Sequence, residues 1–397
     1  GLNGEIRPVT GVLPAVIQAK QANRIIILPE ANLEEASVIK GARILGAAHL
    51  LDVCAFLLQQ QPLMEADTEK VAVPVPEYEA DLADIRGQAQ AKRVLELCAS
   101  GGHSLLMVGP PGSGKSMLAS RLVTLLPEMA LEQAVEVAAI RSVAGQPVSP
   151  ETFFQRQLVH PHHTATAPSL VGGGTGHVVK PGALSLAHHS VLFLDEIPEF
   201  NRSVIEALRE PLETGKVEIS RVNQQVTYPA DVQLVCAMNP SPSGYFSDDP
   251  LGRCKDTPEQ IDRYLKKVSG PLMDRIDCHL EIAPVTFEQL SEPKDSSAEN
   301  SEVVRARVAA CRQRQLARQG KLNAQLGPKD LKDQVSLDEA SSGLLQQSVD
   351  RLGMSARGYH KVLRLALTLA DMAGDQAVTV QHIAEAISYR SLDKKMS

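Results

Sequence analysis

The sequence predicts an α/β fold: a parallel sheet in a central core, a helical region after it and a smaller α+β unit before it. The apolar run 104–108 leads into a glycine-rich segment, 109–116, which opens the amphipathic stretch 117–126. Two further apolar runs, 191–194 and 232–238, have the length and composition of buried parallel strands. A strand, a glycine-rich turn and a helix in this order predict a phosphate-binding loop in an α/β core.

The glycine-rich segment has every fixed position of such a loop. Its residues are Gly109, Pro110, Pro111, Gly112, Ser113, Gly114, Lys115 and Ser116. The backbone N–H groups of the loop and the N-terminus of the following helix can converge on a triphosphate. We expect Lys115 to reach the β- and γ-phosphates and the Ser116 hydroxyl to ligate Mg²⁺.

Polar residues follow the other two apolar runs. Asp195 ends the run 191–194 and fits Mg²⁺ coordination, while Glu196 can polarise a water for in-line attack on the γ-phosphate. Asn239 follows the run 232–238 and can orient the same water, although Asn before Pro240 is also a common turn residue. These side chains should meet, because parallel strands present ligand-binding groups at their carboxyl ends.

Further motifs along the chain resemble the AAA+ ATPases, more closely their magnesium-chelatase-like branch, and within it the ComM and YifB family of bacterial competence proteins. They are Asp84-Ile-Arg-Gly-Gln88, His160-Pro-His-His-Thr164, Leu170-Val-Gly-Gly-Gly174, Pro181-Gly-Ala-Leu-Ser-Leu-Ala-His188, Leu194-Asp-Glu-Ile-Pro-Glu-Phe200, Ser269-Gly-Pro-Leu-Met-Asp-Arg-Ile-Asp277 and Ser355-Ala-Arg-Gly-Tyr-His-Lys361. The likeness covers essentially the whole chain.

This resemblance implies a homo-oligomeric, hexameric ring with ATP and Mg²⁺ as cofactors. It implies an ATPase acting on single-stranded or branched DNA, a helicase that promotes branch migration of recombination intermediates during natural transformation. A chelatase-type or protein-remodelling ATPase is the alternative. Stimulation of ATP hydrolysis by DNA would distinguish the two.

Two arginines match catalytic positions of the family. Arg275 would be an arginine finger offered to the γ-phosphate of the adjacent subunit, and Arg357 would contact the same phosphates from the lid. The alternative for Arg275 is an ordinary salt bridge to Asp274 or Asp277.

Composition limits the possible partners. A net charge of −7 argues against a surface coated with nucleic-acid-binding charge, although a ring can confine basic groups to its pore. The absence of Trp weakens any case for an exposed base-stacking platform. Six scattered cysteines and the lack of an apolar stretch of membrane-spanning length suit a cytoplasmic protein without a membrane partner.

The predicted organisation has five parts. These are an N-terminal unit (1–58), a proline-containing linker (59–79), the ATPase core (80–284) with an insertion at about 131–185, a linker with an arginine-rich helix (285–326) and a helical lid (327–397). The first part is expected to contain a strand at 25–28 and a helix over 33–46, and it resembles the C-terminal half of the Lon-protease domain. Pro14 stands where that family places its catalytic lysine, and the serine would precede residue 1, so we expect no protease activity.

The insertion carries His160, His162, His163 and His177, with His188 and His189 just beyond. They lack convincing ligand spacing and have no evident carboxylate or cysteine nearby, so contacts of His162 and His163 with carbonyls or DNA phosphates are favoured over zinc. Many relatives have Arg-Pro-Phe-Arg before this histidine motif, whereas this chain keeps Arg156 and has Val159 at the second arginine position.

Three more features concern DNA and zinc. The stretches 216–220 and 225–228 predict a hairpin, and Arg221 at its tip is either a phosphate contact or a solvated turn residue. The segment 302–319 carries Arg305, Arg307, Arg312, Arg314 and Arg318 and either binds DNA or crosses between domains. Where some relatives have Cys-x-Cys, this chain has Ser241-Pro-Ser243 and then Cys254-Lys-Asp256, so we predict no zinc there.

Overall fold

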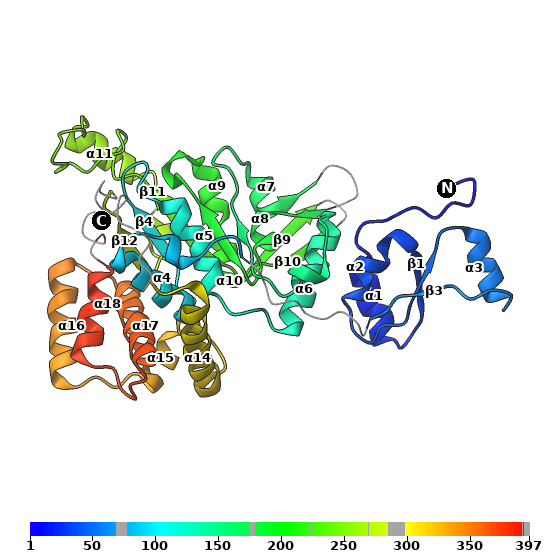
Figure 1. The fold of residues 1–397 in the computed structure, drawn as a ribbon. Coiled ribbons are helices and arrows are strands. Elements are labelled where there is room, and N and C mark those ends of the chain that lie inside the picture. The colour runs from blue at the N-terminus through cyan, green and yellow to red at the C-terminus, as the bar shows by residue number, and fades with distance from the viewer. Residues whose placement is uncertain are drawn as a thin grey trace.

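The N-terminal unit is a small three-stranded sheet with helices on it. The computed structural model describes residues 1–68, 78–174, 179–221, 224–268, 270–284, 298–390 and 392 (Figure 1). The unit contains α1 (Val12–Gln21), β1 (Ile26–Pro29), η1 (Glu30–Asn32), α2 (Leu33–Ser37), β2 (Ile44–Ala47), α3 (Leu50–Leu57) and β3 (Met64–Glu65). Strands β1 and β2 are parallel, and β3 adds to β2 in the antiparallel sense.

Two predictions for this unit are corrected. The helix predicted over 33–46 ends after Ser37, and the segment from Ile44 forms β2. Gly41, between α2 and β2, has the left-handed conformation (φ 71°), which does not continue a helix. The buried residues of β2 gain a parallel partner in β1. The expected linker 59–79 contributes β3 to the sheet, while its residues 69–77 lie outside the described residues.

The central sheet has five parallel strands in the order β12-β4-β11-β8-β5. They are β4 (Leu105–Val108), β5 (Leu158–Val159), β8 (Val191–Leu194), β11 (Gln233–Met238) and β12 (Cys278–Glu281). The predicted α/β class with a parallel sheet is confirmed. The stretch 131–185 is more than an insertion, because it supplies the edge strand β5.

Helices cover both faces of this sheet, so each face has its own apolar core. One core joins α4 (Ala89–Gly101), α5 (Lys115–Leu125) and the lid helices to the sheet. The other joins the sheet to shorter helices and the hairpin. The shorter helices of the second core are α8 (Ala183–Leu186), η4 (Ile197–Glu199), α9 (Arg202–Ala207), α10 (Arg209–Thr214), α11 (Pro258–Leu265) and α12 (Gly270–Met273), whereas η2 (Leu82–Asp84) packs in the first core through Leu82.

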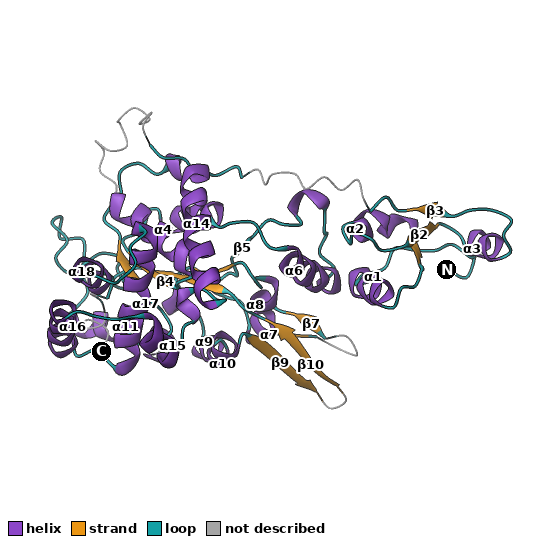
Figure 2. Ribbon diagram, turned by 90° about the horizontal axis from the view of Figure 1, so that it is seen from below, coloured by secondary structure: helices purple, strands orange, loops and turns teal. Residues whose placement is uncertain are grey.

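The 131–185 stretch and the hairpin project from the core. The stretch holds α6 (Leu131–Ala144), η3 (Pro150–Thr152), α7 (Ala167–Val171) and the short pair β6 (Gly172–Gly173) and β7 (Lys180–Pro181). Helix α6 packs on α1 and so joins the N-terminal unit to the core. The predicted hairpin is present as β9 (Lys216–Arg221) and β10 (Gln224–Pro229), which project together in Figure 2. Its turn, 222–223, and His177 lie outside the described residues.

The C-terminal region is helical, as predicted. It consists of α14 (Ser301–Gln319), η5 (Asn323–Gln325), α15 (Pro328–Gln334), α16 (Glu339–Leu352), α17 (Ala356–Ala373) and α18 (Val380–Ser388). Residues 285–297 of the expected linker lie outside the described residues. None of the helices within the described ranges has the length and apolarity needed to cross a membrane.

The arginine-rich helix α14, expected either to bind DNA or to cross between domains, is a packing element of the core. Its apolar side packs on α4, α5 and α17. All five arginines have partners within the protein: Arg305 with Thr124 O, Arg307 with Glu96 and Glu299, Arg312 with Ala99 O, Arg314 with Asp371 O, and Arg318 with Asp371 and Asn323. It is not a solvated helix that connects two domains, because its residues Val304, Val308 and Cys311 are buried.

Candidate functional site

The phosphate loop joins the carboxyl end of β4 to the first turn of α5. Gly112 and Gly114 have φ angles of 76° and 88°, so side chains there would be strained. At Gly109 the obstacle is space, because a Cβ would lie 2.7 Å from Ile282 O and 2.8 Å from Ser113 Oγ. The three glycines therefore let the backbone form a cradle that opens at the N-terminus of α5, where an anionic phosphate is stabilised.

Lys115 is buried and folds back over this loop. Its Nζ donates hydrogen bonds to Gly109 O (2.7 Å), Pro110 O (3.0 Å) and Asn239 Oδ1 (3.1 Å). Burial lowers the pKa of Lys115, against the opposing charges of Asp195 and Glu196. The contact places Asn239, at the end of β11, beside the phosphate loop. A phosphate oxygen could replace the carbonyl acceptors of this ammonium group.

Ser116 and Asp195 come together as predicted from the strand ends. The exposed Ser116 hydroxyl donates to Asp195 Oδ2 at 2.9 Å, and Asp195 Oδ1 accepts from the backbone N–H of Glu196 at 2.9 Å. One hydroxyl and one carboxylate next to a phosphate cradle are oxygen donors of the kind that hold Mg²⁺ with a nucleotide. The residues therefore fit a nucleotide with its Mg²⁺.

Glu196 lies one residue further, in a left-handed conformation (φ 52°) that is uncommon for a residue with a side chain. Its side chain is 51% exposed, and its Oε2 is 3.2 Å from His163 Nδ1. His163 thus contacts the glutamate, whereas the sequence suggested carbonyls or DNA phosphates as its partners. The rings of His162 and His163 have centroids 4.1 Å apart and are tilted by 35°, and His162 Nδ1 contacts Thr164 Oγ1 at 2.8 Å.

The two arginines assigned by resemblance have acidic partners in the same chain. Arg275 forms an ion pair with Glu213, and Arg357 Nη1 lies 2.9 Å from Asp274 Oδ2. The alternative salt bridge for Arg275 therefore exists, but with Glu213 in place of Asp274 or Asp277. Burial lowers the pKa of Arg275, and Arg357 adds to this effect, so the two guanidinium groups are within electrostatic range of each other.

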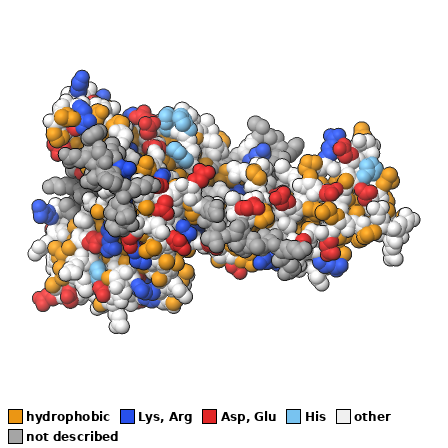
Figure 3. Space-filling view, viewed as in Figure 1, with side chains coloured by type: hydrophobic (Ala, Val, Ile, Leu, Met, Phe, Trp, Pro, Cys, Tyr) orange, Lys and Arg blue, Asp and Glu red, His pale blue; other side chains and the backbone are white. Residues whose placement is uncertain are grey.

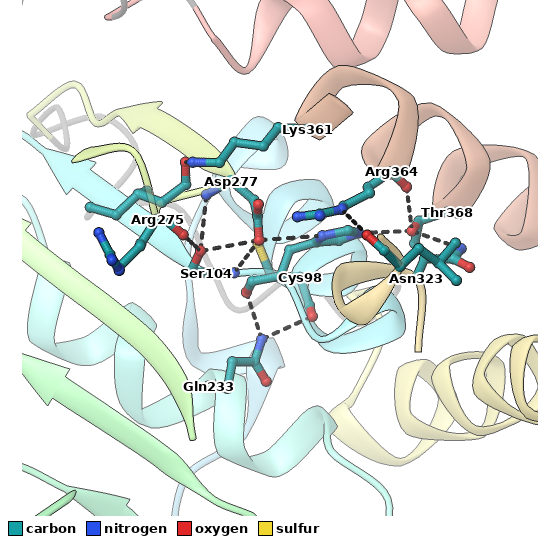
Figure 4. Close-up of polar contacts among 12 residues, drawn as sticks. Cys98, Ser104, Gln233, Arg275, Asp277, Asn323, Lys361, Arg364 and Thr368 are labelled. Atoms are coloured by element: carbon teal, nitrogen blue, oxygen red, sulfur yellow. Dashed lines mark hydrogen bonds and ion pairs between the residues drawn. The ribbon is translucent and has the colours of Figure 1, made fainter. Parts of the chain in front are cut away.

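A buried polar network fixes the segment that carries Arg275 (Figure 4). Ser104 Oγ, at the amino end of β4, donates to Arg275 O at 2.7 Å, and Asp277 N donates to Ser104 Oγ at 2.9 Å. From the lid, Lys361 Nζ donates to Ile276 O at 2.7 Å. Burial would raise the pKa of Asp277, but His103, Lys361 and Arg364 hold it well below its usual range. Sequence reasoning missed this network, because its members come from three distant segments.

His188 and His189 do have a carboxylate neighbour, contrary to the sequence-based expectation. Glu136 Oε2 lies 3.1 Å from His188 Nε2 and 3.2 Å from His189 Nε2. However, His188 Nδ1 accepts a hydrogen bond from the N–H of Asp231 (3.1 Å), so the proton of the neutral ring is on Nε2. That nitrogen has no lone pair for a metal and donates to Glu136.

Hydrogen bonds hold together the segment 241–256, in which some relatives have a Cys-x-Cys pair and this chain does not. Ser243 N donates to Asp256 Oδ2 at 2.7 Å, and Ser241 Oγ donates to Tyr245 O at 2.8 Å. Cys254 Sγ is 3.7 Å from Ser243 Oγ and 3.9 Å from Ser241 Oγ. A single sulfur among hydroxyl groups is a poor donor set for tetrahedral zinc.

The strand order, the phosphate loop and the Asp-Glu pair after β8 define a P-loop ATPase core of the AAA+ type. Residues 81–290 match the family described as magnesium chelatase, subunit ChlI, and residues 298–390 match its C-terminal family. The chain belongs to this magnesium-chelatase-like family of AAA+ ATPases. Membership implies ATPase activity and the use of a nucleotide with Mg²⁺.

Similar curated proteins extend over almost the whole chain. The competence protein ComM of Haemophilus influenzae is 42% identical over 98% of this chain and 76% of its own length. The uncharacterized protein YifB of Escherichia coli is 42% identical over 99% of this chain and 76% of its own length. The magnesium-chelatase 67 kDa subunit of Chlorobaculum parvum is 29% identical over 40% of this chain and 23% of its own length. The resemblance inferred from the motifs is thereby confirmed.

Proposed function

We propose that this protein is an ATP-driven motor that acts on DNA, a helicase that promotes branch migration of recombination intermediates during natural transformation. The observation that carries the ATPase part is the 2.9 Å contact between Ser116 and Asp195, with Glu196 next in the chain. The DNA part is supported by the extended similarity to a competence protein. We place the activity in the cytoplasm, in a homo-hexameric ring.

The nucleotide site would use the side chains already described. The loop 109–116 binds the phosphates, with Lys115 on the β- and γ-phosphates. Ser116 and Asp195 hold Mg²⁺, which supplies charge neutralisation when it is bound. Glu196 accepts the proton of the attacking water, and Asn239 orients that water. Each of these assignments is a proposal.

Arg275 would complete the site of the neighbouring subunit. Its partner Glu213 is 57% exposed, so the ion pair is open to solvent on one side and can be exchanged for a phosphate. Arg357 also has an accessible partner in Asp274, which is 43% exposed. Both arginines are held by carboxylates that a triphosphate with greater negative charge can displace.

DNA would be bound by the β9–β10 hairpin and the 131–185 stretch. Lys, Arg, Asp and Glu are interspersed on the face seen in Figure 3, which presents no broad basic surface. The arginines of α14 are already used within the protein. A projecting hairpin that ends at Arg221 is therefore the better candidate for contact with a strand in the pore of a ring.

The remaining assignments concern organisation. We keep the proposed boundaries at about 79, 284 and 326, with an inactive Lon-like unit at the start that extends through β3.

DNA-stimulated hydrolysis is the deciding experiment. We expect single-stranded or forked DNA to raise the ATPase rate, and nucleotide to tighten DNA binding by favouring assembly. The match to the magnesium chelatase family supports the alternative, a chelatase-type or protein-remodelling ATPase. An oligomer that hydrolyses ATP but neither binds DNA at low salt nor responds to it would favour that alternative.

A further inference from the structure

We propose that a cavity at the amino-terminal edge of the central sheet binds a small phosphate monoester through Arg156 and Arg312. The cavity has a volume of about 690 Å³, which is within the range of small-molecule sites. Ser104, Ser190 and Gln233 line it at the start of β4, β8 and β11. The phosphate loop follows the carboxyl end of β4, so the cavity and the proposed nucleotide site lie at opposite edges of the sheet.

Arg312, on α14, has a guanidinium group that is only partly used within the protein. Its Nε donates a hydrogen bond to Ala99 O at 2.7 Å. Within the described ranges of the chain, Nη1 and Nη2 have no hydrogen-bond partner and Arg312 forms no ion pair. These two nitrogens are not closed off from solvent, and the residue lines the cavity. A guanidinium group with two open nitrogens matches two oxygens of one phosphate group.

Arg156 brings a second positive charge to the same cavity. It donates hydrogen bonds to Pro127 O at 2.7 Å, to His189 O and to Gln133 Oε1 at 3.2 Å, and all three acceptors are neutral. Burial lowers the pKa of Arg156 to about 10. Burial, and after it the charge of Arg156, lower the pKa of Arg312 to about 9. Both groups are therefore charged at neutral pH and repel each other, and an anion bound between them would relieve this repulsion.

The rest of the lining limits the kind of anion. Three exposed acidic residues line the cavity as well: Glu128, Glu132 and Asp231. The charge of Asp231 opposes the effect of burial on the pKa of Arg156. Arg275 and Asp277 also line the cavity, and both already have charged partners within the protein.

These carboxylates favour a ligand with one phosphate group and several hydroxyl groups. They repel a highly charged polyphosphate, but they can accept hydrogen bonds from hydroxyl groups. Leucines from three segments add apolar surface to the cavity: Leu126, Leu316 and Leu322. The lining therefore fits a phosphate group joined to a hydroxyl-bearing body, as in a nucleoside monophosphate or a sugar phosphate.

Titration calorimetry of the full chain tests this site, in a buffer free of phosphate and sulfate. The probes are AMP and ribose 5-phosphate, with adenosine as the matched compound that lacks the phosphate. Lys115→Ala serves as a background in which the phosphate loop is disabled. We expect each ester that binds to do so equally in the wild type and in Lys115→Ala, and adenosine to bind to neither. The tighter ester shows whether the ligand is a nucleoside monophosphate or a sugar phosphate.

Variants on α14 show whether the arginine holds the phosphate. Arg312→Gln should weaken binding of the ester by about 10- to 100-fold, because a charged hydrogen-bonded contact is lost. Arg312→Lys keeps the charge without the fork and should weaken binding less. Arg305→Gln is the matched control, since Arg305 is on the same helix and its Nε donates to Thr124 O at 2.8 Å, but it does not line the cavity. Thermal unfolding of each variant checks that folding is unaffected.

Three results would overturn the proposal, and none of them depends on whether DNA stimulates hydrolysis. The first is that neither ester binds to the wild type at millimolar concentration. The second is binding that is lost in Lys115→Ala and kept in Arg312→Gln, because the phosphate would then lie in the loop 109–116. The third is an equal loss of binding in Arg305→Gln and Arg312→Gln, because α14 would then act only through its packing.

Discussion

Ser116 Oγ and Asp195 Oδ2 lie 2.9 Å apart, although 79 residues separate them in the chain. The contact exists because β4 and β8 both flank β11 in the same direction, so their carboxyl ends share one edge of the sheet. It places Glu196 beside the phosphate cradle. Glu196 is therefore in position to act on a water next to the γ-phosphate.

Glu196→Gln should bind ATP normally and lose turnover. The loop 109–116 and Asp195 are unchanged in this variant, but an amide cannot accept the proton of the attacking water. A general base contributes about 10²–10⁴ to the rate, so phosphate release should fall by that range. Nucleotide titration and a phosphate-release assay measure the two properties. Undiminished hydrolysis would remove Glu196 from the mechanism.

Arg275→Ala should bind ATP but hydrolyse it poorly if the arginine acts on a neighbour. Loss of such a finger costs roughly 10³–10⁵ in rate. Mixing this variant with Lys115→Ala should recover some activity, because some interfaces then combine an intact loop with an intact finger. Arg202→Ala is the matched control, since Arg202 is 85% exposed and forms its ion pair with Glu206 of the same helix, α9. A mixed assembly without recovery would contradict a role in trans.

Asp371→Ala should strongly destabilise the C-terminal region. Asp371 is almost fully buried and accepts from Arg318 Nη2 and Asn323 Nδ2, each at 2.8 Å. The substitution removes an acceptor of the buried Asn323 amide and the partner of Arg318, whose side chain is 29% exposed, so we expect a loss of about 1–3 kcal/mol of unfolding free energy. Chemical denaturation measures this loss. In comparison, Arg202→Ala should change stability by no more than about 1 kcal/mol, because its pair is exposed.

The free energy of unfolding should fall as the pH drops below about 6.5, partly because of His279. Burial lowers the pKa of His279 well below its ordinary value, and Arg390 and Lys361 act in the same direction. The unfolded chain therefore binds a proton that the folded chain does not, and stability rises with pH until the unfolded histidine is neutral. His279→Asn should reduce the slope of stability against pH by up to about 1.4 kcal/mol per unit. Identical slopes would show that His279 does not titrate differently in the two states.

Local patterns predicted the elements on which the site depends. The strand, glycine loop and helix around Lys115, the hairpin and the lid helices all follow from short-range periodicity and turn chemistry. The helix predicted over 33–46 failed because β2 gains a parallel partner in β1, which local propensity does not reveal. Contacts between distant segments were beyond prediction wherever neither segment carried a recognisable motif at a strand end. His163 and Glu196, or Glu136 and His188, meet only because the fold brings together segments whose sequences do not indicate each other.

Arg221→Ala should weaken DNA binding and lower DNA-stimulated hydrolysis, while the basal rate stays nearly unchanged. Arg221 ends strand β9, and the nucleotide site is built from other residues. If phosphates are the contact, affinity should be insensitive to base sequence and should fall steeply with salt. Fluorescence anisotropy of a labelled fork at two salt concentrations, with and without a non-hydrolysable ATP analogue, measures this. Arg307→Gln is the matched control: Arg307 on α14 is held by Glu96 of α4 and by Glu299, so its loss should leave DNA binding unchanged. If the control weakens binding as much as Arg221→Ala does, α14 and not the hairpin carries the DNA contact.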